Sequence, residues 1–343
     1  MIAGGSFVAG QYVYTIIREQ AQAWRCLSDD RPEFQGQAPY LFVGSGSSYY
    51  LAKVACAYAI ALGLACQAVP AAEVLMDPDL WLPRFNSIII ISRSGTTTEA
   101  LLVAQLAKRY PGCHMAALTS HQASPLARLV HHVYAAESSD DGTVVMIRSF
   151  TSMLVLIQGM LSQLAGAKST ECLTRYFPEV FEQASVMVES LFRAEPRRIY
   201  VLGGGVRQGI ADEGVLKMQE MAGATAFAFN PMEFRHGPWG SLTKGDVVVL
   251  LAQRSRKIYE QELLADLQQR QARVVLIGPA MWFAGLPQPL TDRVILPDAV
   301  SDLEAGPLAV VPLQLLAWKW ALINGQDPDA PRNLNAVVVL KHV

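Results

Sequence analysis

The 343-residue sequence has few charged residues and no excess of either sign. Lysine and arginine together number 28 and aspartate and glutamate 30, which gives a formal net charge of −2. Proteins that bind nucleic acid or an anionic membrane through a basic face normally carry a clear positive excess. The composition therefore predicts neither a nucleic-acid-binding protein nor one that binds a membrane surface.

Cysteine is also scarce, and the five residues (Cys26, Cys56, Cys66, Cys113 and Cys172) are scattered along the chain. Their number is odd and no Cys-x-x-Cys pair occurs, so the spacing favours neither a zinc site nor a disulfide framework. We expect small apolar core residues in a reducing compartment.

The N-terminal segment MIAGGSFVAGQYVY lacks a basic region followed by an apolar core, so it does not predict a secretory signal. The apolar stretch from Leu51 to Cys66 carries Lys53 and is too short to span a bilayer. It predicts a buried helix, and we expect a cytoplasmic protein.

Unbroken apolar runs alternate with helical patterns along most of the chain, and 51% of the residues are hydrophobic. Such runs are typical of parallel strands that are covered on both faces. The runs that predict strands are YLFV, SIIIIS (87–92), HMAALT (114–119), HHVYAA (131–136), RRIYVL, GDVVVLLAQ (245–253), RVVLIGP (273–279) and RVILP (293–297). Helical spacing predicts helices over 11–27, 150–165, 173–193 and 306–323, after the GSGSS turn and within TTTEALLVAQLAKRY.

The order strand, glycine turn, helix, strand, polar turn, helix occurs twice in the sequence. This internal repeat predicts an α/β protein with two doubly wound, flavodoxin-like parallel sheets in tandem. We expect an N-terminal helix plus a first domain over 1–165, a second domain over 166–328 and a tail over 329–343.

Two turns in the first half of the chain are rich in hydroxyl groups. They are Gly44-Ser45-Gly46-Ser47-Ser48 and Ser92-Arg93-Ser94-Gly95-Thr96-Thr97-Thr98-Glu99. Each follows a predicted strand and opens a helix, where unpaired backbone N–H groups favour an anion. Plain helix capping by Ser and Thr is the alternative. The first turn lacks the third glycine of GxGxxG, and no GK[ST] of a Walker loop follows it. A single phosphate is therefore favoured over a nucleotide as the ligand. For the same reason an NAD-dependent dehydrogenase is not predicted.

A second cluster comprises Glu213, Lys217 and Glu220, whose spacing puts them on one helical face. His236 follows in a segment that breaks at Gly237-Pro238, and a loop position is expected for it. A solvated ion-pair stripe and a structural histidine are the alternatives. A carboxylate together with a histidine can move protons between adjacent sugar carbons. The dispersed histidines show no metal-ligand spacing, so neither a metal nor a cofactor is predicted.

The motifs GSGSSYY, SRSGTTTEAL, VVMIRSFTSML, EGVLKMQE, MEFRHGP and VPLQLLAWKWALINGQDPDAPRNL resemble the sugar isomerase (SIS) domain family. Within that family, the sequence from about residue 38 to 340 is similar to the isomerase half of glucosamine-6-phosphate synthase, a tandem of two SIS domains. The resemblance implies two SIS domains, a phosphorylated sugar as substrate and no cofactor.

The resemblance also implies roles for single residues. Those expected to hold the sugar phosphate are Ser47, Ser48, Ser92, Arg93, Ser94 and Thr97. Glu220 would move the proton between C1 and C2 through an enediol-like intermediate, and Lys217 would support it. His236 would assist ring opening and, as in the family, would come from the neighbouring subunit of a homodimer.

Three departures from the synthase pattern bear on the reaction. The sequence has neither a glutaminase domain nor a cysteine at its start, Ala336 stands where the synthase has a Schiff-base lysine, and Met146 replaces a substrate-contacting serine. The prediction is a phosphosugar aldose/ketose isomerase that acts on an amino-sugar 6-phosphate and releases ammonia. A fructosamine 6-phosphate deglycase and a non-catalytic sugar-phosphate sensor are the alternatives.

Overall fold

The structure is a computed structural model that describes residues 8–29, 32–167, 173–286 and 292–335. The expectations that concern residues 1–7, Cys172 and Ala336 fall outside this part of the chain, as does the side chain of Cys26.

The first sheet has five parallel strands in the order β2-β1-β3-β4-β5. The strands are β1 (Tyr40–Gly44), β2 (Cys66–Pro70), β3 (Ser87–Ile91), β4 (His114–Thr119) and β5 (His132–Ala135). The surrounding helices are α2 (Ser47–Ala61), α3 (Ala71–Met76), α4 (Pro78–Trp81), α5 (Thr98–Ala107) and α6 (Arg148–Leu164), with short 3₁₀ turns at Leu82–Arg84 and Glu137–Ser139. Successive residues of β1 enter different apolar clusters, Leu41 on one face and Phe42 on the other, so the sheet is covered on both faces.

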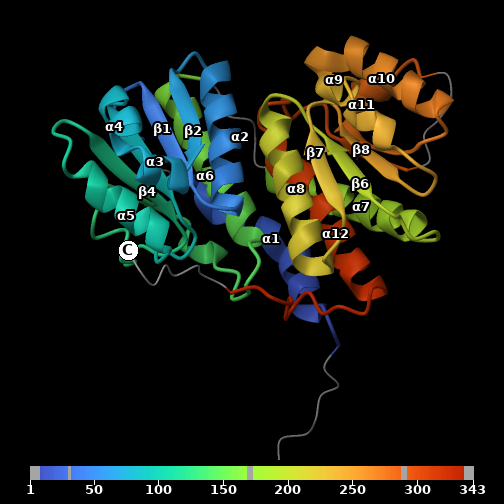
Figure 1. Ribbon diagram of the computed structural model, residues 1–343, viewed down its shortest axis with the longest axis horizontal. Coiled ribbons are helices and arrows are strands. Elements are labelled where there is room, and N and C mark those ends of the chain that lie inside the picture. Colours follow the sequence, from blue (N-terminus) through green and yellow to red (C-terminus); the bar gives the residue numbers. More distant parts are fainter. Residues whose placement is uncertain (1–7, 30–31, 168–172, 287–291, 336–343) are drawn as a thin grey trace, which may run out of the picture.

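The second sheet repeats this arrangement with strands in the order β10-β9-β8-β6-β7, again all parallel (Figure 1). Its strands are β6 (Ile199–Leu202), β7 (Ala226–Phe229), β8 (Val247–Leu251), β9 (Arg273–Pro279) and β10 (Arg293–Leu296). Its helices are α7 (Phe177–Leu191), α8 (Val206–Ala222), α9 (Pro231–Phe234), α10 (Lys257–Gln269), α11 (Ala280–Phe283) and α12 (Gly306–Ile323), with 3₁₀ turns at Leu173–Arg175, Pro238–Ser241 and Arg254–Arg256.

Both sheets have the strand order 2-1-3-4-5 in chain sequence, which is the flavodoxin-like order. The predicted fold class and the predicted internal repeat are therefore confirmed. In each sheet the first and third strands are neighbours, so the chain reverses direction across the sheet between β1 and β3 and again between β6 and β8. These two switch points are where ligands bind in open parallel sheets.

Two edge strands, β2 and β7, were not among the predicted strands. The expected helix from Leu51 to Cys66 is wrong over its last residues, because α2 ends at Ala61 and Cys66 begins β2. Both missed strands are short and only partly buried, since each has a neighbour on one side only. Gln67 interrupts the apolar residues of β2, and the apolar run of β7 is only four residues long.

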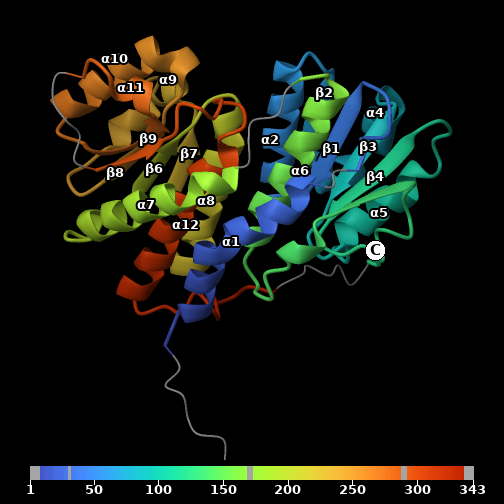
Figure 2. The same cartoon turned by 180° about the vertical axis from the view of Figure 1, so that it is seen from behind.

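Helices α1 (Gln11–Asp29) and α12 join the two halves of the molecule. α1 packs on α6 and α12, and α12 packs on α8, α7 and α6. In the front and back views α1 lies between the two sheets (Figures 1 and 2). One continuous apolar cluster runs from Val13 of α1 to Ala321 of α12. The boundaries at 165/166 and 328/329 stay predictions.

α12 is long and apolar enough to cross a membrane by length and composition, and 78% of its apolar window is buried inside the fold. Burial in a core explains its composition. Cys56, Cys66 and Cys113 are free thiols that are buried or partly buried, as expected. The Sγ atoms of Cys56 and Cys66 lie 2.8 Å apart, a contact that the spacing did not predict.

Candidate active site

A pocket of about 180 Å³ lies at the carboxyl edge of the first sheet, beside the C-terminal part of α8. It is lined by Ser45, Gly46, Ser47, Ser48, Arg93, Thr97, Glu99, Val144, Met146, Glu220, Leu334 and Asn335. Five of the nine residues predicted for the site meet in this lining: Ser47, Ser48, Arg93, Thr97 and Glu220.

The first hydroxyl-rich turn opens α2 without a side-chain cap. The residue before the helix is Gly46, and no side chain caps the first backbone N–H groups. Ser47 and Ser48 are buried in the first turn of the helix, where the Ser47 hydroxyl accepts a hydrogen bond from Lys217 Nζ at 3.1 Å. Ser48 Oγ lies 3.9 Å from Met146 Sδ. The capping alternative therefore does not account for these two serines.

In the second turn, two of the predicted residues shape the backbone instead of lining the pocket. Ser92 Oγ accepts a hydrogen bond from the Gly95 backbone N–H at 3.1 Å and lies 3.3 Å from Thr97 Oγ1. Ser94 Oγ accepts hydrogen bonds from the backbone N–H and the hydroxyl of Thr96, at 3.2 and 2.8 Å. Arg93 and Thr97 are the residues of this turn that were predicted for the site and reach the pocket.

Arg93 holds the loop that closes one side of the pocket. Its Nη1 donates to the backbone carbonyls of Thr143 and Val145, at 2.9 and 3.3 Å. It also lies 3.9 Å from the buried carboxylate of Asp141, which accepts the backbone N–H of Arg148 at the start of α6. The loop that carries Met146 is thereby fixed against the serine turn.

Glu213, Lys217 and Glu220 form a buried network rather than a solvated ion-pair stripe. The Lys217 side chain is 0% exposed; its Nζ lies 3.3 Å from Glu213 Oε1 and contacts Glu220 Oε2. The Glu220 side chain is 21% exposed and is the only member of the network that lines the pocket. Lys217 therefore contacts both Ser47, in the first hydroxyl-rich turn, and the carboxylate of Glu220.

The charges in this network follow from burial and from mutual attraction. Burial raises the pKa of Glu213 to about 8, so this carboxyl is largely protonated at neutral pH. Burial alone would lower the pKa of Lys217, but the facing carboxylates of Glu213 and Glu220 outweigh it and raise that pKa. Lys217 thus remains a cation beside the pocket, which favours an anionic ligand.

The close packing of α2 against α8 sets this geometry. The two helices run in opposite directions, so the start of α2 faces the second half of α8, as the contact between Ser47 and Lys217 shows. A Cβ atom at Gly209 would lie 2.6 Å from the carbonyl oxygen of Tyr50, so glycine permits the close approach. An ion pair between Lys53 and Asp212 joins the same two helices.

His236 is exposed in the turn that follows α9, and it does not line the pocket. α9 begins just beyond the carboxyl end of β7, whereas Glu220 lies near the C-terminal end of α8, next to the opposite edge of the second sheet. The 17 residues of α8 span about 25 Å. One chain therefore does not bring His236 to Glu220, and its contribution from a partner subunit stays a prediction.

Sequence reasoning missed several lining residues. Glu99 faces the pocket from the first turn of α5, and Val144 comes from the loop held by Arg93. Leu334 and Asn335 show that the C-terminal segment reaches the pocket. The tail motif PRNL was the one signal that pointed to this segment, and the next residue, Ala336, lies outside the described part.

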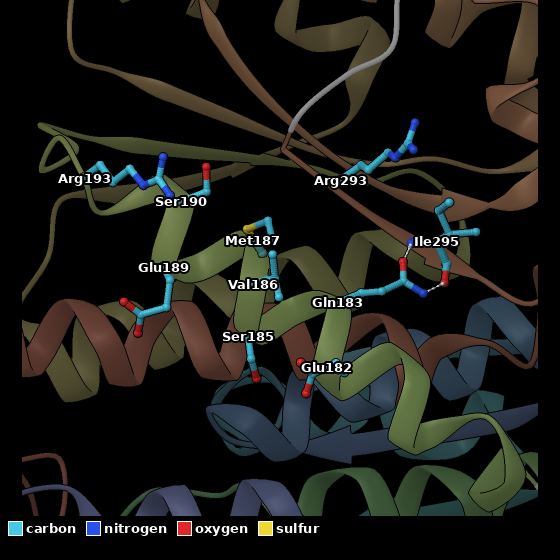
Figure 3. A pocket seen from close by; sticks show the side chains of 10 residues that line it. All are labelled: Glu182, Gln183, Ser185, Val186, Met187, Glu189, Ser190, Arg193, Arg293 and Ile295. Atoms are coloured by element: carbon cyan, nitrogen blue, oxygen red, sulfur yellow. Dashed lines mark hydrogen bonds between the residues drawn. The ribbon is translucent and has the colours of Figure 1, made fainter.

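A larger groove of about 750 Å³ lies along α7 beside β10 (Figure 3). Gln183 projects across it, and its Oε1 accepts the Ile295 backbone N–H at 2.7 Å. None of the residues predicted for the site lines this groove, and no hydroxyl-rich turn opens into it. Across the described ranges, no three His, Cys, Asp or Glu side chains gather as a metal site.

Comparisons with known proteins agree with the geometry. The chain is similar to glutamine–fructose-6-phosphate aminotransferase (isomerizing) from Thermococcus kodakarensis, with 26% identity over 316 residues that cover 88% of this chain and 52% of that protein. The corresponding protein of Pseudomonas syringae is 29% identical over 322 residues, which cover 87% and 51% of the two chains. The chain spans about half the length of these curated relatives.

Among solved structures, glucosamine-6-phosphate deaminase from Thermotoga maritima superposes with a TM-score of 0.83 and 26% identity, over 96% of this chain and all of that one. Tagatose-6-phosphate ketose/aldose isomerase from Escherichia coli has a TM-score of 0.76 at 23% identity, over 93% and 95% of the two chains, and shares the fold. The model of the SIS domain matches residues 37–162 and 192–279, one stretch in each half of the molecule. The chain therefore belongs to the SIS domain family, whose members include phosphosugar isomerases.

Proposed function

We propose that this protein is a phosphosugar aldose/ketose isomerase that acts on an amino-sugar 6-phosphate and releases ammonia. The observation that carries the proposal is the pair of side-chain contacts that Lys217 makes with Ser47 and with Glu220. It places a carboxylate at one wall of a small pocket whose other wall is a turn suited to a phosphate group.

The phosphate would lie at the start of α2, between the serine turn and Thr97. Hydroxyl groups and helix N–H groups converge there, and the helix dipole favours negative charge. Lys217 adds a buried positive charge behind Ser47. Ser92 and Ser94 would contribute by holding the second turn in shape, and Arg93 by holding the 143–146 loop.

In the proposed reaction Glu220 removes the proton from C2 of the open-chain aldose and returns it to C1. The O1 oxygen takes up a proton as the enediol-like intermediate forms, and the Lys217 cation faces Glu220 throughout. When C2 carries an amino group, the product of proton transfer is a C2 imine. Addition of water then gives the ketose phosphate and ammonia, so the atoms balance without a redox step.

Ring opening requires a proton donor or acceptor at O5 and O1, and we propose that His236 of a second subunit supplies it. The exposure of His236 and its distance along the fold from Glu220 are what this arrangement requires. The proposal thus includes a homodimer with two composite sites. We also propose that the protein acts in the cytoplasm.

The similarity to the Thermotoga maritima deaminase supports the release of ammonia, because it extends over nearly the whole of both chains. A fructosamine 6-phosphate deglycase is the second candidate. Met146 is compatible with it, because this side chain presents a thioether to Ser48 in the pocket, where the resemblance expects a serine. The same phosphate turn and the same carboxylate would serve that reaction.

The test is to incubate the purified protein separately with glucosamine 6-phosphate, with glucose 6-phosphate and with the fructosamine 6-phosphate of lysine. Ketose phosphate, ammonia and free lysine are followed together. Ammonia and fructose 6-phosphate from the amino sugar, lost in Glu220→Gln and kept in the exposed control Glu189→Gln, is the result we expect.

Free lysine from the fructosamine would assign the deglycase instead. A third outcome is that the protein binds these sugar phosphates, more weakly in Ser48→Ala, and converts none of them. That result would contradict the enzymatic function and assign a sensor. Retention of full turnover in Glu220→Gln would contradict the proposed mechanism.

A further inference from the structure

The turn after β6 repeats the backbone of the serine turn after β1. In the first sheet Tyr40 pairs with Ser87 at the switch point, and in the second Ile199 pairs with Val247. This register matches Gly46 with Gly205, and their dihedral angles agree: φ 57° and ψ −129° for Gly46, φ 56° and ψ −126° for Gly205.

The same register matches Gly44 with Gly203 and Ser48 with Arg207. A Cβ atom at Gly44 would lie 2.5 Å from the backbone of Ser48, and one at Gly203 would lie 2.3 Å from the backbone of Arg207. Both turns lead into helices of at least 15 residues without a side-chain cap. The second turn, at the start of α8, therefore offers the same anion-binding backbone as the first.

Arg207 is the unusual residue of this second turn. It is 1% exposed, and its Nε, Nη1 and Nη2 atoms have no hydrogen-bond partner in the described part of the molecule. Burial lowers its pKa to about 10, so it is still a cation at neutral pH. Buried guanidinium groups normally have partners, so this one calls for a ligand.

The groups around Arg207 come from the loops that follow β8 and β10. Its charge interacts with those of Asp302, Glu260 and Arg254. Asp302 is already engaged by Arg254, with Oδ1 3.1 Å from Nη1 and Oδ2 2.7 Å from the backbone nitrogen. Burial raises the pKa of Glu260 to about 7, so this carboxyl is only partly ionised at neutral pH. Neither carboxyl accepts a hydrogen bond from Arg207 within the described residues.

Two further side chains tie the second turn to the loop after β8. Gln253 is buried, and its Nε2 donates to the carbonyl of Gly204 at 2.8 Å. The Arg256 guanidinium lies over the glycines: a Cβ atom at Gly204 would be 2.5 Å from its Nη1. The Arg256 guanidinium and a helix N-terminus thus meet at one turn that has no side chain of its own at 203–205, and the buried Arg207 follows directly in the first turn of α8.

We propose that the turn Gly203–Arg207, with Arg256, is a second oxyanion site that binds the phosphate group of a small phosphorylated molecule. A phosphate offers three acceptor oxygens and up to two negative charges, which match the unpartnered N–H groups of Arg207 and the facing Arg256. The site is distinct from the candidate active site. It lies at the carboxyl edge of the second sheet, where α9 and α10 lie in Figure 1, and not beside the first sheet.

Equilibrium dialysis with inorganic phosphate tests the site by counting bound phosphate per chain. We expect Arg207→Met and Arg256→Gln each to lose up to one phosphate per chain relative to the natural protein. Arg109→Gln, which removes an exposed arginine of the first domain, should lose none. Ser48→Ala should leave the phosphate that depends on Arg207 in place, which separates this site from the candidate active site.

Thermal unfolding provides the fold control. Without phosphate, Arg207→Met should unfold at the same temperature as the natural protein or higher, because an unpartnered buried charge has been removed. Phosphate should raise the unfolding temperature of Arg207→Met less than that of the natural protein. If Arg207→Met does not fold, phosphate binding by the variant Arg256→Gln, at a partly exposed position, tests the site instead. Phosphate binding that is unchanged in both variants would overturn the proposal, whether or not the protein proves to be an isomerase.

Discussion

The two switch-point turns share one backbone and differ in the helix that faces them. The first turn carries Ser47 and Ser48 and meets the second half of α8, whose EGVLKMQE segment supplies Lys217 and Glu220. The second turn carries Arg207, and the second half of α2 reads ACAYAIA, with no acid or base. On the two proposals made above, the repeated fold provides two anion sites, whereas proton transfer requires the residues of one helix.

The buried charges at the two turns differ in the same way. Glu213 and Lys217 are both fully buried and face each other with 3.3 Å between Oε1 and Nζ. Arg207 is equally buried and has no hydrogen-bond partner within the described residues. The buried cation of the first turn therefore has carboxyl groups facing it, whereas no ion pair to the cation of the second turn occurs within the described residues.

The largest expected effect is a difference in turnover between variants of Glu220, at the first turn, and of Glu260, beside the second turn. Glu220→Gln should lower the turnover of glucosamine 6-phosphate by about 10²–10⁴-fold, because general-base catalysis contributes that much. Glu260→Gln removes the carboxyl beside the second turn and should change kcat by less than about threefold. Steady-state kinetics of both variants measures this. A similar loss in the two variants would contradict the assignment of proton transfer to the first turn.

A second expected contrast concerns stability. Lys217→Met leaves the buried Ser47 hydroxyl and the Glu220 carboxyl without the cation that contacts them and should lower the free energy of unfolding by about 2 kcal/mol. Arg207→Met removes a charge that has no hydrogen-bond partner and should cost nothing in the absence of phosphate. Urea unfolding in phosphate-free buffer compares the two. Equal losses would show that Arg207 has a stabilising role that these contacts do not reveal.

Stability should fall as the pH rises from about 5 to 8. Burial raises the pKa of Glu213 to about 8 and that of Glu260 to about 7, so the folded state retains protons that the unfolded state has released. Each group contributes stability below its unfolded pKa, near 4.5, and loses it as the pH rises through its folded pKa. The slope is at most about 1.4 kcal/mol per pH unit for each group.

The same pH series on variants tests these assignments. Glu260→Gln should flatten the slope between pH 5 and 7. Glu213→Gln should act similarly up to pH 8, where Lys217 and Glu220 remain the charged groups that face this position. Chemical unfolding across this range measures both, and an unchanged slope in both variants would contradict the raised pKa values.

The smallest expected effect concerns the wall of the first pocket. Met146→Ser replaces the thioether that faces Ser48 by a hydroxyl and should change KM for glucosamine 6-phosphate several-fold, with kcat nearly unchanged. A large fall in kcat would instead place this side chain among the groups that act in the proton transfer.

The central part of the fold could be predicted from the sequence because β1, β3, β8 and β9 are nearly unbroken apolar runs. Edge strands β2 and β7 could not, since both are short and only partly buried, and Gln67 interrupts β2. The helices predicted over 11–27, 150–165, 173–193 and 306–323 agree with α1, α6, α7 and α12 to within a few residues at each end.

The turns of the candidate site could be predicted because they are local sequence motifs. The burial of Lys217 could not, because the same spacing occurs on solvated helix faces, and only the packing of α2 on α8 removes it from water. The sequence did not indicate that Arg207 is buried either, because its burial also depends on tertiary packing. Its burial depends on loops some fifty and ninety-five residues further along the chain, those of Arg254 and Asp302.

The central claim is that Glu220 moves a proton between C1 and C2 of a sugar held by its phosphate. The most direct test is to incubate the protein with fructose 6-phosphate in deuterium oxide and follow deuterium at C1 by NMR. We predict incorporation into one prochiral C1 position, slowed at least 100-fold in Glu220→Gln and unaffected in Arg207→Met. Incorporation at the natural rate in Glu220→Gln would contradict the claim and assign the proton transfer to another residue.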